Sequence, residues 1–93
     1  MLPEITVLMS VYNGEKYLRQ SIESVLNQTY KNFEFLIIND CSSDTTLDII
    51  NSYDDKRIKV INNPENIGLT KSLNKGLNVA KGKYIARIDA DDY

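Results

Sequence analysis

Short apolar runs alternate with longer amphipathic segments along this 93-residue chain, and no other feature limits its possible folds as much. Apolar runs rich in β-branched residues are typical of buried strands, whereas apolar residues three or four apart are typical of helices that cover a sheet. Strands are expected at 5–11, 33–40, 57–63 and 83–89. Helices are expected at 15–28, at 44–53, and from residue 69 to a stop at Gly82.

Strands joined by crossover helices run parallel, and right-handed crossovers arrange them in an open sheet. The sequence therefore predicts an α/β fold: an open, mostly parallel, doubly wound sheet of the Rossmann type, with about four strands and three helices. The first strand, ITVLMSV, is almost wholly apolar, as expected of a central strand covered on both faces. No repeat, low-complexity segment or linker interrupts residues 1–93, so a single domain is expected.

Charge and composition exclude several classes of function. A net charge of −2 gives no broad basic field, which argues against a nucleic-acid partner. There is no histidine and one cysteine, Cys41, so Ser–His–Asp triads, thiol–histidine nucleophiles and histidine metal sites are excluded. No apolar run approaches the ~20 residues of a membrane span, and the first residues lack a basic segment. A cytoplasmic setting is therefore expected, and any metal has to be held by carboxylates.

Polar residues follow every expected strand, and a doubly wound sheet binds its ligand at the carboxyl ends of the strands. All of these residues are therefore expected at one edge of the sheet. In chain order they are Tyr12, Asn13, Glu15, Asp40, Asp44, Asn62, Asn63, Asp89, Asp91 and Asp92.

Asp89 and Asp91 form a D-x-D pair just past the fourth expected strand. Two carboxylates in this spacing can face one hard cation, Mg²⁺ or Mn²⁺, that also accepts oxygen ligands from water and phosphate. Taken alone, the pair is equally consistent with an acidic, solvated terminus. A calcium loop of the EF-hand kind is disfavoured, because the glycine and the closing glutamate of such a loop are missing.

Two further positions have competing interpretations. Asp40, in NDCSSD, either pairs with the base or ribose of a nucleotide or hydrogen-bonds its own turn, while Ser43 or Asp44 caps the next helix. Lys71 lies in the first turn of the third expected helix, where amide donors and the helix dipole favour a phosphate. The remaining lysines of this region are interpreted as a solvated helix face: Lys75, Lys81 and Lys83.

Three segments in series strongly resemble the N-terminal half of glycosyltransferase family 2, enzymes of the GT-A fold: VLMSVYNGEKYLRQSIESVLNQTYKNFEFLIINDCSSDTT, NNPENIGLTKSLNKG and GKYIARIDADD. The resemblance covers essentially the whole chain. It implies a nucleotide-diphosphate sugar, commonly a uridine one, with a divalent cation bridging the diphosphate. It also implies transfer of the sugar to an acceptor hydroxyl, with inversion of configuration, in polysaccharide or glycoconjugate synthesis.

The resemblance also implies a donor site, residue by residue. The loop that contacts the base and ribose matches Val11, Tyr12, Asn13 and Glu15. Asp40 matches the acid that recognises the uracil edge. The D-x-D motif matches Asp89, Ala90 and Asp91, with Asp89 toward the ribose or metal and Asp91 as the more direct metal ligand.

Two positions depart from the family pattern. Many relatives carry an arginine where this chain has Leu73, which leaves Lys71 or Arg87 as the phosphate contact. The usual NDGS is NDCS here, so Cys41 occupies a turn position where glycine would be permissive, and it is given no catalytic role.

In the family, the catalytic base is a carboxylate that follows the D-x-D motif, so the resemblance implies no catalytic residue within 1–93 and a base beyond Tyr93. The chain is then the donor-binding part of an incomplete GT-A domain, inactive alone. The full-length protein would act in the cytoplasm at the inner membrane face. The alternative is a non-catalytic nucleotide-binding module, or one that forms a homodimer through the exposed edge of an incomplete sheet.

Overall fold

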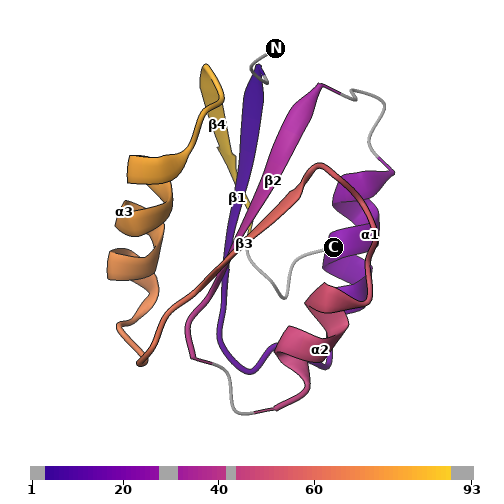
Figure 1. Ribbon diagram of the computed structural model, residues 1–93, viewed down its shortest axis with the longest axis vertical. Coiled ribbons are helices and arrows are strands. Elements are labelled where there is room, and N and C mark those ends of the chain that lie inside the picture. Colours follow the sequence, from indigo (N-terminus) through magenta and orange to yellow (C-terminus); the bar gives the residue numbers. More distant parts are fainter. Residues whose placement is uncertain (1–3, 28–31, 42–43, 89–93) are drawn as a thin grey trace.

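The computed structural model describes residues 4–27, 32–41 and 44–88. Within these ranges a four-stranded parallel sheet has the order β3-β2-β1-β4, with helices on both faces (Figure 1). The predicted doubly wound α/β fold is confirmed. In chain order the elements are β1 (Ile5–Val11), α1 (Leu18–Leu26), β2 (Phe33–Asn39), α2 (Thr46–Asn51), β3 (Ile58–Asn62), α3 (Leu69–Val79) and β4 (Tyr84–Arg87).

The strand order reverses beside β1, because β2 and β3 lie on one side of it and β4 on the other. Helices α1 and α2 cover one face of the sheet, and α3 covers the opposite face (Figure 1). The carboxyl ends of the strands next to such a reversal form the ligand crevice of a doubly wound sheet. The fold therefore places the ends of β1, β2 and β4 where a ligand is expected.

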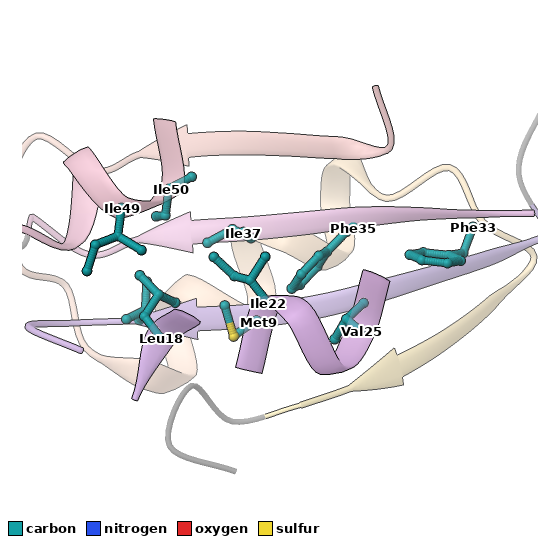
Figure 2. Packing of buried hydrophobic residues seen from close by; sticks show 10 residues of the cluster. Met9, Leu18, Ile22, Val25, Phe33, Phe35, Ile37, Ile49 and Ile50 are labelled. Carbon is teal, nitrogen blue, oxygen red and sulfur yellow. The ribbon is translucent and has the colours of Figure 1, made fainter. Parts of the chain in front are cut away.

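The larger part of the core lies between the sheet and the helices α1 and α2 (Figure 2). Leu18, Ile22 and Val25 are four and three residues apart, so they share one face of α1, and each is at most 2% exposed. They pack against Phe35 and Ile37 of β2, which are fully buried. Full burial of side chains of this size contributes about 1.5–3 kcal/mol each, so this layer supplies much of the stability.

A smaller apolar cluster lies between the sheet and α3. Its buried members are Leu8, Leu36 and Ile38, and Leu73 packs against them. Helix α3 approaches β1 closely at Gly76, where an added Cβ would lie 2.4 Å from Cδ1 of Leu8. The absence of a side chain at this position lets the helix pack directly on the strand.

Two helices have other ends than the periodicity predicts. The helix expected from residue 15 begins at Leu18, because residues 15–17 form a turn in which the amides of Tyr17 and Leu18 both donate to the carbonyl of Gly14. Gly82 was predicted to stop the third helix, and this is wrong: α3 ends at Val79. No helix within the described ranges has the length and apolar character needed to cross a membrane.

Among the residues that the structure describes, strand β4 forms one edge of the sheet and pairs only with β1. All four of its residues are exposed, including Tyr84 at 56% and Ile85 at 42%. By contrast, every residue of β2 is buried. The sheet is therefore well covered at its centre and open at the β4 edge.

Candidate functional site

The backbone segments that leave the strands meet at the carboxyl edge of the sheet, as the sequence predicts. The amide of Asp40 donates to the carbonyl of Val11 at 2.8 Å, and the amide of Asn63 donates to that of Asn39 at 2.9 Å. On the other side of β1, the amide of Ile88 donates to Leu8 at 3.0 Å. The exits of β1, β2 and β3 therefore lie in adjacent positions, whereas the last residue of β4, Arg87, is opposite Leu8 in the middle of β1.

Asp40 joins the end of β2 to the start of α3. Its Oδ1 accepts the backbone amide of Ile67 at 2.8 Å and Nδ2 of Asn63 at 2.9 Å, and its Oδ2 accepts the amide of Gly68 at 2.9 Å. The side chain is 2% exposed. Asp40 was expected either to bind a nucleotide or to bond its own turn; the bonds in the structure go to the loop before α3.

The environment of Asp40 favours its ionised form. Burial raises the pKa of the carboxyl group, whereas the hydrogen bonds from Ile67, Asn63 and Gly68 lower it. Together the hydrogen bonds outweigh burial, so the pKa lies below its ordinary value. Because the charge sits beside the amino end of α3, it also interacts favourably with the helix dipole. The carboxylate thus lies close to where the sequence predicts a phosphate.

A second set of polar residues extends from Asp40 into α3. Lys75 Nζ donates to Oδ1 of Asn63 at 2.8 Å, and Nδ2 of Asn63 lies 3.1 Å from Oγ of Ser72. Lys75 was interpreted as part of a solvated face, and this is wrong for its ammonium group. The three-residue spacing of Ser72 and Lys75 puts both on one face of α3, which is the signal that could have found them.

The loops after β1 and before α2 brace each other. The amide of Gly14 donates to the Thr46 hydroxyl at 2.9 Å, and the amide of Glu15 donates to Asp44 at 3.4 Å. In return, the Glu15 carboxylate accepts the amide of Thr45 at 3.2 Å and also its hydroxyl. Glu15 therefore positions the loop that carries Tyr12, in addition to any contact with a ligand.

The prediction that Asp44 is the N-cap of α2 is wrong, because the N-cap residue is Thr45; Asp44, one residue earlier, accepts the amide of Thr46, the first residue of the helix, at 2.9 Å. Ser43 lies outside the described residues. Burial raises the pKa of Asp44, and hydrogen bonds from the Thr46 hydroxyl and amide and from the Glu15 amide bring it below its ordinary value.

The β1 loop presents an aromatic ring at the carboxyl edge. Tyr12 directly follows Val11 of β1 and is 52% exposed. Asn13 has a φ of 50°, in the left-handed region that asparagine tolerates better than most residues. The positions matched to base and ribose contact are thus at the predicted edge, with the Tyr12 ring exposed.

Cys41 turns the chain out of β2 with a φ of 60°. This confirms the expectation that it occupies a position where glycine would be permissive. Its side chain is exposed, with Sγ 3.6 Å from the carbonyl oxygen of Pro64.

The residues matched to phosphate contact lie on different elements. Lys71 is exposed in the first turn of α3. Arg87, the last residue of β4, is also exposed and lines grooves on both faces of that strand. Leu73, where the resemblance implies an arginine in many relatives, packs against the smaller apolar cluster.

The predicted D-x-D motif, Asp89, Ala90 and Asp91, lies outside the described residues. Among the residues that are described, no group of three or more acidic, cysteine or histidine side chains could hold a metal ion. Ile88, immediately before the motif in sequence, donates its amide to the carbonyl of Leu8, which lies midway along β1.

The family model described as Glycosyl transferase family 2 matches residues 6–93. The chain therefore belongs to glycosyltransferase family 2. It is 49% identical over 92 residues to an uncharacterized glycosyltransferase of Haemophilus influenzae, an alignment that covers 97% of this chain and 28% of that protein.

Two other relatives have names or structures that refer to nucleotide sugars. The chain is 43% identical to the UDP-Glc:alpha-D-GlcNAc-diphosphoundecaprenol beta-1,3-glucosyltransferase WfaP of Escherichia coli, over 96% of this chain and 36% of that one. The fold superposes with a TM-score of 0.92 on S. aureus TarS 1-349 in complex with UDP-GlcNAc, at 34% identity, over 97% of this chain and 27% of that one. The chain thus spans about a third of the length of these relatives or less.

Proposed function

We propose that this chain forms the donor-binding part of a family 2 glycosyltransferase that transfers a hexose from a UDP-sugar to an acceptor hydroxyl, with inversion, in polysaccharide or glycoconjugate synthesis. The observation that carries the proposal is the convergence of Tyr12, Asp40 and the amino end of α3 at one edge of the sheet. The similarity to TarS, solved with UDP-GlcNAc, and to WfaP, named for UDP-Glc, supports a uridine nucleotide.

Each part of the site has a separate task in this proposal. The exposed Tyr12 ring packs on the base, and Asp40 accepts a hydrogen bond from the N–H of the uracil edge. Val11, Asn13 and Glu15 shape the loop around the base and ribose. Lys71 and Arg87 supply positive charge to the diphosphate, in place of the arginine that Leu73 replaces.

A divalent cation, Mn²⁺ or Mg²⁺, is proposed at Asp89 and Asp91, with Ala90 between them. The donor set fits, because carboxylates are the ligands that hard cations take. The parallel pairing of β4 with β1 supports this assignment, because β4 runs toward the carboxyl edge of the sheet in the residues just before Asp89. When bound, the cation supplies charge that stabilises the departing nucleoside diphosphate.

The catalytic base and the acceptor site are proposed to belong to the part of the protein outside residues 1–93. The small share of each relative that the chain covers supports this division of tasks. The chain alone would then bind the donor without transferring the sugar. In the cell, the whole protein is proposed to work in the cytoplasm at the inner membrane face.

Titration of the chain with UDP by calorimetry, with and without Mn²⁺, tests this function. We expect binding that requires the metal and that weakens roughly tenfold or more in Asp91→Ala, because a direct ligand is lost. Asp92→Ala is the matched control, since it removes an adjacent carboxylate that has no role in the proposed site. If UDP does not bind in the presence of metal, or if Asp91→Ala binds as well as the wild type, the assignment is wrong.

A second candidate is a module that pairs with another copy of itself, with or without nucleotide. The exposed β4 edge is the observation that favours it, because an unpaired strand edge is a template for a further strand. Sedimentation at several concentrations distinguishes a self-associating module from a monomeric one.

A further inference from the structure

Two buried polar side chains hold the connection from α3 to β4. The amide of Lys81 donates to Oε2 of Glu34 at 2.6 Å, and the amide of Gly82 donates to the Thr6 hydroxyl at 2.8 Å. Thr6, on β1, is fully buried, and Glu34, its partner on β2, is 8% exposed. Two consecutive amides of the connection are therefore bound by side chains of two different strands. These contacts lie near the amino ends of β1 and β2, away from the candidate site (Figure 1).

The Thr6 hydroxyl joins the two acceptors into one unit. A hydroxyl has a single donor, and here it goes to Oε2 of Glu34 at 2.5 Å, so its oxygen lone pairs are left for the amide of Gly82. Glu34 thus accepts one amide directly and orients the acceptor for the next. The approach is also close, because an added Cβ at Gly82 would lie 2.3 Å from the backbone nitrogen of Thr6. Together these contacts fix where along β1 the connection begins.

The side chains of β4 contribute little to its register. Thr6 pairs with Ile85 and Leu8 pairs with Arg87, yet all four residues of β4 are exposed. Register is strongly specified where one face of a strand is buried and weakly specified elsewhere, because a slip of one residue turns every side chain to the other face. The register of β4 on β1 therefore has to come mainly from the contacts at its start.

We propose that Glu34 is a positioning residue for the metal site: with Thr6 it sets the register of β4, and thereby the position of the carboxylates that follow the strand, Asp89 and Asp91. The inference rests on the proposed function, because the two metal ligands belong to that proposal. Glu34 acts from the amino end of the sheet and touches neither the metal nor the nucleotide.

Loss of the Glu34 carboxylate removes both parts of this support. The amide of Lys81 loses its acceptor, and the Thr6 hydroxyl becomes free to turn away from Gly82. A strand that then slips by one residue moves every later residue one step along, so that Ala90 takes the place of an acid. The cation would lose a ligand, although both aspartates are still in the chain.

Cross-strand NMR contacts measure the register directly. In the wild type, Thr6 should contact Ile85. Glu34→Met keeps a side chain of similar length but loses both acceptor oxygens, so this contact should weaken and contacts displaced by one residue should appear. Glu34→Gln keeps an acceptor oxygen and should retain the wild-type contact. Ile22→Val is the control, because it destabilises the core beneath α1 without touching the connection, and it should leave the register unchanged.

Manganese binding measures the consequence for the site. Mn²⁺ is titrated in the presence of UDP, and binding is followed by the loss of the EPR signal of the free ion. Binding should be about tenfold weaker in Glu34→Met, and unchanged in Glu34→Gln and Ile22→Val. Thr6→Val removes the hydroxyl and keeps the branched shape, so it should change the register and the Mn²⁺ affinity in the same direction. It serves as the test variant if Glu34→Met does not fold.

The possible outcomes are distinct. Wild-type contacts in Glu34→Met, or in Thr6→Val if Glu34→Met does not fold, overturn the proposal. A changed register with unchanged Mn²⁺ affinity overturns the link to the metal site. If Ile22→Val weakens Mn²⁺ binding as much as Glu34→Met does, the loss follows from general destabilisation and the proposal is also overturned. If the wild-type chain binds no Mn²⁺ with UDP, the proposed function fails, whereas the role of Glu34 in the register is still decided by the NMR contacts.

Discussion

At the scale of single residues, Cys41 has a strained backbone conformation that glycine would adopt at lower cost. Its φ of 60° costs a residue with a Cβ about 1–2 kcal/mol, and glycine returns about 0.5–1 kcal/mol of that through its larger unfolded-state entropy. Cys41→Gly should therefore raise the free energy of unfolding by up to about 1 kcal/mol, which is roughly 4–8 °C in Tm. Cys41→Ala, which loses the thiol but keeps the Cβ, should bring no gain; equal stabilisation by both variants would contradict the strain.

Asp40 and Asp44 should make the free energy of unfolding depend on pH in the acidic range. Both carboxyl groups have a folded-state pKa below the ordinary value of 3.8, so their contribution is complete above that pH and is lost as the pH falls through the folded-state pKa. Denaturant unfolding should give constant stability from neutral pH to about pH 5 and a decline below about pH 4. Asp44→Asn should be less stable at neutral pH and decline less steeply; an unchanged pH profile would contradict this assignment.

The sequence predicts the positions of residues at strand ends well, because the sheet topology sets them. It predicts contacts between loops poorly, because these depend on the path of each loop. Val11, Asp40 and Asn63 lie at the expected edge, because parallel strands bring their carboxyl ends together. The bond from Thr45 to Glu15 and the bond from Lys75 to Asn63 were not predicted. Both join loops and helices distant in sequence, and local patterns hold no information on how such segments meet.

At the scale of elements, Gly82 fixes how the segment after α3 joins the sheet. A Cβ at this position would lie 2.3 Å from the backbone nitrogen of Thr6, and its amide donates to the Thr6 hydroxyl at 2.8 Å. Gly82→Ala should lower the free energy of unfolding by about 2–3 kcal/mol, because backbone has to move rather than a side-chain end. The measurement is denaturant unfolding.

Lys81→Ala is the matched control for this prediction. Its side chain is exposed, and the amide of residue 81, which donates to the buried carboxylate of Glu34 at 2.6 Å, is retained. The change should be within about 0.5 kcal/mol. If Gly82→Ala is as mild as Lys81→Ala, the close approach does not control the joint.

The order and type of all seven elements follow from apolar periodicity, but their ends do not. Periodicity records which face of an element meets the core, and it continues past the point where the backbone leaves the helix. At Glu15 the pattern is helical, yet the backbone forms a turn tied to Asp44. Gly82 was interpreted as a local signal for the end of a helix, whereas the structure shows that glycine is needed there for a close tertiary approach to Thr6.

At the scale of the whole molecule, apolar surface gathers around β4. On the α1 side, a groove of about 320 Å³ runs between Val25, Phe33 and Ile88. On the α3 side, a groove of about 290 Å³ lies between Leu77 and Ile85. All four residues of the strand between them are exposed, so in the described part of the chain its outer edge and its faces are accessible to a partner.

This surface predicts association of the chain with itself. The sedimentation coefficient of the wild type should rise with concentration, because pairing at β4 would satisfy the unpaired backbone groups and cover the apolar grooves. Ile85→Lys places a charge on the edge strand and should keep the chain monomeric. Val79→Lys is the control: it replaces an exposed apolar residue at the end of α3, away from the strand edge, and should leave association intact. A wild type that stays monomeric at the highest concentration would contradict self-association. If Ile85→Lys and Val79→Lys reduce association equally, the association depends on general apolar contact rather than on pairing of strands.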